Sequence, residues 1–156
     1  MDKTNPPRSF GVFKPVGHTV IAFPTAAAME AAASSLLSQG FTVSDLVRYT
    51  PAEMKAQVEA DLLTASPLAA VGQEINLVKA HRTLAENGCS FLVVYAPHDA
   101  LAQRVDAAVH AMQATSAQRY GSFLIEELVD LPAGATQVFE SPDRGLDVGA
   151  TGATRR

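Results

Sequence analysis

The chain is poor in cysteine, and this scarcity excludes several kinds of site. Cys89 is the single cysteine among 156 residues, so neither an intrachain disulfide nor a Cys-x-x-Cys zinc or dithiol motif can form. A reducing compartment is the simplest setting for such a chain, and we expect a cytoplasmic protein. Cys89 opens a strongly apolar run, which favours a buried, unreactive thiol over a nucleophile.

Positive charge is scarce as well. The 12 Lys and Arg residues are scattered and are outnumbered by 16 Asp and Glu residues, which leaves a net charge of −4. This balance argues against nucleic-acid binding by phosphate neutralisation. The apolar segment 19–37 is interrupted by Pro24 and Glu30, so it is too broken to span a bilayer. We therefore expect neither a nucleic-acid partner nor a membrane partner.

The short motifs of common enzyme classes are missing. The glycine cluster at 145–152 follows no expected strand and precedes no expected helix, so it does not predict a phosphate-binding loop. The chain contains no Gly-x-Ser-x-Gly elbow and no His-Glu-x-x-His pair. Its four histidines stand at no helical metal-ligand spacing. We expect no metal and no other cofactor, and the sequence singles out no biochemical activity.

The composition does fit one folded domain, because 47% of the residues are apolar. We expect an N-terminal arm over residues 1–17, a single α+β domain over 18–131 and a flexible C-terminal tail over 132–156, which is rich in Gly, Ala, Thr and Pro. The apolar side chains of the arm that are candidates for docking on the domain are Phe10, Val12 and Phe13.

Within the domain, a strand–helix–strand unit occurs twice. The apolar strand 19–23 leads into a helix with Thr25 as its candidate N-cap, and a strand follows over 41–49. The same pattern returns as a strand over 91–96, a helix that starts near Asp99 and a strand over 122–129. The chain therefore contains a degenerate βαβ duplication.

The charges on these strands predict their order. The first and third strands are continuously apolar and should be central, whereas the second and fourth carry charged residues and should lie at the edges. A ferredoxin-like split βαβ sheet in the order 4-1-3-2 has this distribution, with both crossover helices on one face.

An insertion of two helices separates the second and third strands. The first starts at Thr50-Pro51-Ala52-Glu53, which combines an N-cap, a proline at the first helical position and a capping-box glutamate. The second restarts at Ser66-Pro67 and ends at Gly88. Because both helices carry an apolar stripe, the pair should either cover the open sheet face or form a dimer surface.

The βαβ halves, together with Phe23-Pro24-Thr25-Ala26, Gln39-Gly40-Phe41 and Arg119-Tyr120-Gly121, resemble small uncharacterised bacterial ferredoxin-like domains related to general stress proteins. The resemblance covers roughly residues 16–129. It implies a stress-associated accessory role without an established catalytic site, and the helical insertion departs from the simplest members of that family. It transfers no functional residue to this chain.

Two groups of residues are candidates for a site. Glu74 and His81 are seven positions apart on one helical face and could orient an acid–base histidine or begin a metal site, with Lys79 or Arg82 attracting an anion. The alternative is a solvated helix edge. Thr25, His98 and Asp99 stand at strand-to-helix turns and could contact a small ligand, although helix capping is the favoured explanation for Asp99 and Thr25 is itself a candidate N-cap.

Three functional hypotheses follow. The leading one is a non-enzymatic stress-associated or regulatory module that self-associates through a sheet edge or the inserted helices, or binds a protein partner. The second is a small-ligand sensor that binds at the strand-to-helix turns or at a dimer seam. The third is an enzyme or metal protein centred on Glu74 and His81.

Overall fold

The computed structural model describes residues 1–9, 11–66, 73–122 and 124–129, without the side chains of residues 73 and 74. The tail expected over 132–156, Phe10 and the helix start at Pro67 lie outside these residues. In chain order, the elements are β1 (Arg8–Ser9), β2 (Val12–Phe13), β3 (His18–Phe23), α1 (Ala26–Ser38), a 3₁₀ helix (Val43–Asp45), β4 (Leu46–Tyr49), α2 (Pro51–Thr64), α3 (Gln73–Glu86), β5 (Ser90–Tyr95), α4 (Asp99–Ala111), β6 (Ser116–Tyr120) and β7 (Ile125–Val129).

The described strands form a five-stranded sheet and a small two-stranded one, so the fold class is α+β as the sequence predicts. The larger sheet has the order β4-β5-β3-β6-β7, and every neighbouring pair is antiparallel. The two continuously apolar strands, β3 and β5, lie inside the sheet and are almost entirely buried. The charged strands β4 and β7 lie at the two ends of this order, which confirms the predicted division into central and edge strands.

The strand beside β3 differs from the prediction. Residues 116–120 form β6, which pairs with β3, whereas the strand expected over 122–129 is β7 and pairs with β6. Helix α4, which precedes both strands, ends at Ala111. Gln113, two residues later, adopts a positive φ of 51°, a left-handed conformation that commonly terminates helices. β6 was hidden in the sequence because Ser116 and Gln118 are polar yet buried, so the strand lacks an apolar signature.

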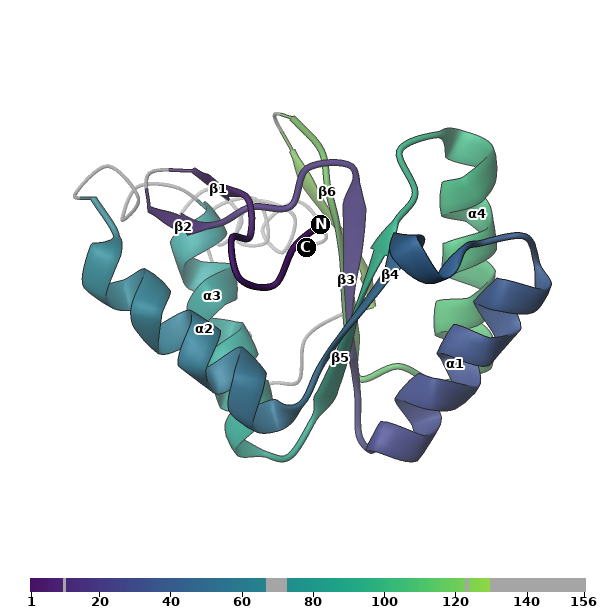
Figure 1. The fold of residues 1–156 in the computed structure, drawn as a ribbon, viewed down its shortest axis with the longest axis horizontal. Helices are drawn as coiled ribbons and strands as arrows, with labels where there is room; N and C mark the ends of the chain where they lie inside the picture. Colours follow the sequence, from purple (N-terminus) through teal and green to yellow (C-terminus); the bar gives the residue numbers. More distant parts are fainter. Residues whose placement is uncertain (10, 67–72, 123, 130–156) are drawn as a thin grey trace, which may run out of the picture.

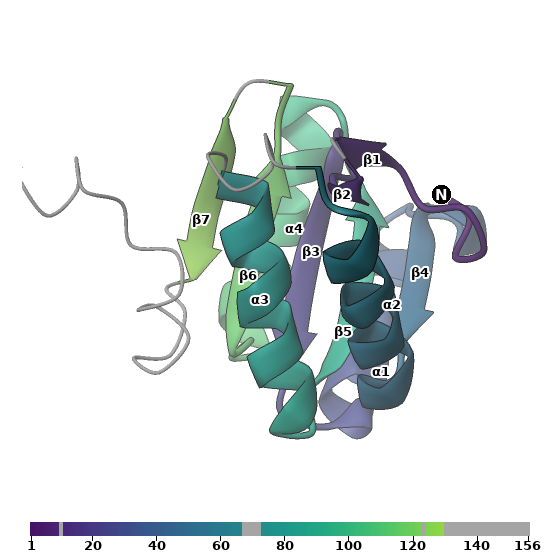
Figure 2. The same cartoon turned by 90° about the vertical axis from the view of Figure 1, so that its left-hand side faces the viewer.

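Helices cover both faces of the sheet (Figure 1). Helices α1 and α4 pack on one face, and the inserted helices α2 and α3 pack on the other, where they run side by side. Figure 2 shows the inserted pair, α2 and α3, in front of the sheet. Of the two roles that the sequence leaves open for this pair, covering the sheet face is therefore the one observed.

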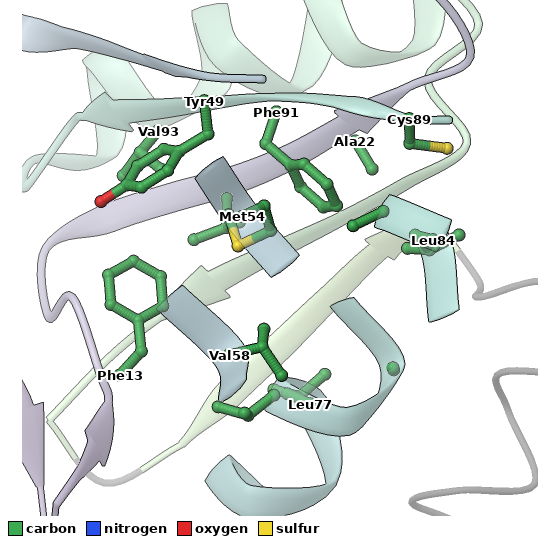
Figure 3. Packing of buried hydrophobic residues seen from close by; sticks show 14 of the residues in the cluster. Phe13, Ala22, Tyr49, Met54, Val58, Leu77, Leu84, Cys89, Phe91 and Val93 are labelled. Carbon is green, nitrogen blue, oxygen red and sulfur yellow. The ribbon is translucent and has the colours of Figure 1, made fainter. Parts of the chain in front are cut away.

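A hydrophobic core fills the space between the sheet and the inserted helices. Tyr49, Phe91 and Val93 project from the sheet toward Met54 and Val58 of α2 (Figure 3). Helix α2 begins as predicted: the Thr50 hydroxyl accepts a hydrogen bond from the N–H of Glu53 at 3.1 Å, and the Glu53 carboxylate accepts one from the N–H of Thr50 at 3.4 Å. This capping box fixes the end of β4 against the start of α2.

The N-terminal arm docks on the inserted helices. Val12 and Phe13 are 1% and 2% exposed, which confirms their predicted docking. The anchor is Asp61 of α2, whose buried carboxylate accepts hydrogen bonds from Phe13 N–H at 3.0 Å, Arg8 Nε–H at 3.1 Å and Gln57 Nε2–H at 2.9 Å. The arm is therefore held by a partly buried charge pair as well as by apolar contacts.

None of the helices in the described part of the chain combines the length and the hydrophobicity that a membrane crossing requires.

Candidate ligand site beside the N-terminal arm

His81 is a core residue. It is 1% exposed, its ring meets Phe91 edge-on at 5.7 Å between centroids, and its Nε2–H donates to Oε1 of Gln118 at 3.2 Å. Burial lowers the pKa of His81 to about 4, although the hydrogen bond to Gln118 opposes the shift. The imidazole is therefore neutral and shielded from water near neutral pH.

Two members of the centre predicted around His81 do not join it. Lys79 and Arg82 are exposed, whereas His81 faces the core, and the Nε of Arg82 lies 3.9 Å from the carboxylate of Glu86. The side chain of Glu74 lies outside the described part of the structure. Among the side chains that are described, no three His, Cys, Asp or Glu residues gather in a way that could hold a metal ion.

The three residues at the strand-to-helix turns do not form one site. β3 and β5 are antiparallel, with Phe23 opposite Ser90 and His18 opposite Tyr95, so the turns that follow them leave from opposite ends of the sheet. Thr25 is thus separated from His98 and Asp99 by about the length of a six-residue strand, roughly 17 Å.

Each of these turn residues has an exposed, local setting. The Thr25 hydroxyl accepts the N–H of Ala28 at 3.1 Å and caps α1. His98 is the N-cap residue of α4 without a side-chain capping bond, and Asp99 begins its first turn. Helix capping therefore accounts for Thr25, and the dipole of α4 favours the charge of Asp99.

A different place on the molecule is hollowed and open to solvent. A hollow of about 440 Å³ lies between the N-terminal arm and the outer side of α2. Its walls come from the arm, from the last residue of β4 and from one face of α2, where the lining residues follow i, i+3, i+4 and i+7 spacing. The lining residues are Lys3, Thr4, Tyr49, Glu53, Ala56, Gln57 and Ala60.

Tyr49 is the most unusual residue of this hollow. Its side chain is 2% exposed, and its buried hydroxyl has no hydrogen-bond partner among the described residues. Burial, reinforced by the negative charges of Asp61 and Glu53, raises the pKa of Tyr49 to about 12. The phenol is therefore neutral and holds a donor and an acceptor that the described part of the fold leaves unused.

The Lys3 ammonium lies over the ring of Tyr49, 5.1 Å from its centroid, and pairs with the carboxylate of Glu53. The hydrogen bond from Lys3 is the main reason that the pKa of Glu53 lies below its ordinary value. An aromatic face and a carboxylate thus converge on one cation.

Gln57 connects this hollow to the anchor of the arm. Its amide lines the hollow and donates to the carboxylate of Asp61. Burial raises the pKa of Asp61, whereas the hydrogen bonds from Arg8 and Phe13 act in the opposite direction. Occupancy of the hollow can therefore be transmitted to the arm through one side chain.

The sequence did not reveal this arrangement, because Lys3 and Thr4 are far from Tyr49 and α2 along the chain. The one available signal was the spacing of Glu53, Ala56, Gln57 and Ala60 on a single helix face, and that pattern is also typical of an ordinary solvated face.

Comparisons of the chain with protein-family models, with curated proteins and with solved structures found no match.

Proposed function

We propose that this protein is a non-enzymatic small-ligand sensor whose ligand occupies the hollow between the N-terminal arm and α2. The observation that carries the proposal is a hollow of about 440 Å³ lined by charged side chains and by Tyr49, whose buried hydroxyl has no hydrogen-bond partner among the described residues. That volume falls within the range of small-molecule sites, which need only a few convergent polar groups. The ligand-sensor hypothesis is therefore retained at a place other than the strand-to-helix turns.

The fold suits a sensor of this kind. The order β4-β5-β3-β6 and the two βαβ units support a ferredoxin-like sheet, to which β7 adds an edge. The inserted helices then supply one wall of the ligand site, and the arm supplies the other. The buried free thiol of Cys89 suits a reducing compartment and so supports a cytoplasmic setting, whereas the stress-associated or regulatory role stays a prediction.

Self-association through a sheet edge is the second candidate. β4 pairs only with β5 among the described strands, and Val43, which precedes β4, is 73% exposed. Because the described apolar stripes of α2 and α3 are used in the core, the sheet edge is the better surface for a homo-oligomer or a protein partner.

A thermal-shift screen of untagged, metal-stripped protein against amines, amino acids, organic acids, nucleotides and divalent metals tests the ligand site. We expect a saturable rise in melting temperature with at least one class of small molecule. The substitution Ala56→Trp should abolish that rise, because Ala56 is exposed and lines the hollow.

Ala52→Trp is the matched control, since Ala52 is exposed on the same helix and does not line the hollow. A shift that persists in Ala56→Trp, or no shift with any compound, would contradict the proposal.

A further inference from the structure

We propose that the ligand is an organic cation, a primary ammonium or guanidinium on a short apolar chain, and that Lys3 occupies its place when the ligand is absent. This inference rests on the proposed function, because it names the ligand class of the same hollow.

The position of Lys3 is the first argument. Its ammonium lies 5.1 Å from the centroid of the Tyr49 ring and pairs with the Glu53 carboxylate. An aromatic face with an adjacent carboxylate is a common way to recognise a free ammonium or guanidinium group. The protein therefore already shows a primary ammonium bound at this place, supplied by its own chain.

The surrounding charges also favour a cation. The carboxylates of Asp61, Glu53 and Asp2 all act on the Tyr49 phenol in the direction that opposes its ionisation, whereas the charge of Arg8 acts in the opposite direction. Arg8 is itself committed to Asp61. Once Lys3 leaves, the carboxylate of Glu53 faces the hollow without its partner, so an anionic ligand would be repelled.

Lys3 can leave without unfolding the arm. The Lys3 and Glu53 side chains are 38% and 41% exposed, so the contact is partly solvated and weak. The arm is anchored further along, at Arg8 and Phe13. Rotation of the Lys3 side chain is therefore sufficient to vacate the ring of Tyr49 and the carboxylate.

The remaining walls define the rest of the ligand. Ala56 and Ala60 leave room for a short aliphatic chain, while Gln57 and Thr4 add neutral polar groups. Because Gln57 also donates to Asp61, the bound ligand would act next to the residue that anchors the arm. The hollow thus fits a small amine or guanidine and links its occupancy to the N-terminal arm.

NMR titration of the full chain with four probes that carry short unbranched alkyl chains tests this inference: butylammonium, butylguanidinium, butyrate and butanol. We expect the two cations to bind more tightly than butanol, and butyrate to bind least. Lys3→Met removes the competing ammonium while keeping the length of the side chain, and should tighten cation binding about three- to tenfold. Glu53→Gln should weaken cation binding by about tenfold, while its amide retains the capping function.

Glu59→Gln is the control, because Glu59 is an exposed carboxylate of α2 outside the hollow. Preferred binding of butyrate, lost in Ala56→Trp, would overturn the cation inference and leave the ligand site standing. Weaker cation binding in Lys3→Met would likewise overturn it. If no probe binds in a manner sensitive to Ala56→Trp, and the wider screen also finds no ligand, both proposals fail.

Discussion

At the scale of single residues, the molecule places several polar groups where water cannot reach them. His81 and Gln118 are 1% and 0% exposed and share one hydrogen bond. Nδ1 of His81 and Nε2 of Gln118 have no partner among the described residues. Such groups are tolerated while they stay neutral, and a proton on His81 would place a charge in the core. His81 therefore couples the stability of the fold to pH.

Acidification should expose this coupling. The pKa of His81 is about 4 in the folded protein and near 6.5 when unfolded, so the unfolded state binds the additional proton between these values. The contribution of a neutral His81 to the free energy of unfolding is complete above pH 6.5 and is lost as the pH falls toward 4. The total loss is about 3 kcal/mol in the free energy of unfolding.

Urea denaturation at a series of pH values, compared between the native chain and His81→Gln, measures this effect. Glutamine does not titrate and can still hydrogen-bond to Gln118. The difference in the free energy of unfolding between the two proteins should be constant above pH 6.5 and should change by about 3 kcal/mol below it. Parallel pH profiles of the two proteins would show that His81 does not carry the coupling. The control is His110→Gln, at an exposed position of α4, which should leave the pH profile unchanged.

At the scale of elements, buried or partly buried charge pairs join segments that are far apart in the sequence. Arg119 of β6 donates to both carboxylate oxygens of Asp106 on α4, at 2.6 and 2.8 Å, and lies 3.4 Å from Glu126 of β7. Asp61 joins α2 to the β1–β2 arm in a similar way. Removal of one partner leaves the others without their hydrogen bonds, so these pairs have large effects on local order.

Asp61→Asn tests how strongly the arm is held. The amide keeps the shape of the carboxylate, but it loses the charge that pairs with Arg8, and its NH₂ group cannot accept from a donor. We expect the free energy of unfolding to fall by about 1–3 kcal/mol and trypsin to cleave faster after Arg8.

Urea denaturation and timed proteolysis with mass spectrometry measure the two effects. Glu59→Gln removes an exposed carboxylate from the same helix and should change neither. An Asp61→Asn protein with native stability and native resistance at Arg8 would mean that the apolar contacts of Val12 and Phe13 hold the arm by themselves.

At the scale of the whole molecule, helices cover both faces of the sheet, and β4 and β7 each pair on one side only among the described strands (Figure 1). The exposed large apolar residues of the described chain are dispersed over several elements, and Val43 is the one next to the β4 edge. A homo-oligomer formed by pairing β4 with β4 of a second copy would bury Val43 and extend the sheet.

Sedimentation velocity of the untagged chain at micromolar concentration tests this assembly. For an interface at β4, we expect a dimer that Val43→Lys dissociates, because dimerisation would remove water from the lysine ammonium. Leu63→Lys, at an 88% exposed position on α2, is the control and should leave the dimer intact. A monomer at every concentration, or a dimer that only Leu63→Lys dissociates, would exclude β4 as the interface.

The amino-acid sequence determined the features that depend on near neighbours. Pro51 and the capping box of Thr50 and Glu53 mark the start of α2, and the apolar runs of β3 and β5 mark the central strands. These signals are readable because a cap or an apolar run is a property of a few consecutive residues.

The tertiary structure decided the features that depend on residues far apart in the chain. Only tertiary packing makes a strand of the polar segment 116–120, because it pairs with β3 and its buried Gln118 bonds to His81 of α3. Likewise, Lys3 meets Tyr49 because the arm docks on α2 through Asp61, Val12 and Phe13. Burial and convergence of charges are properties of the packed chain, so the candidate ligand site could not be read from local pattern.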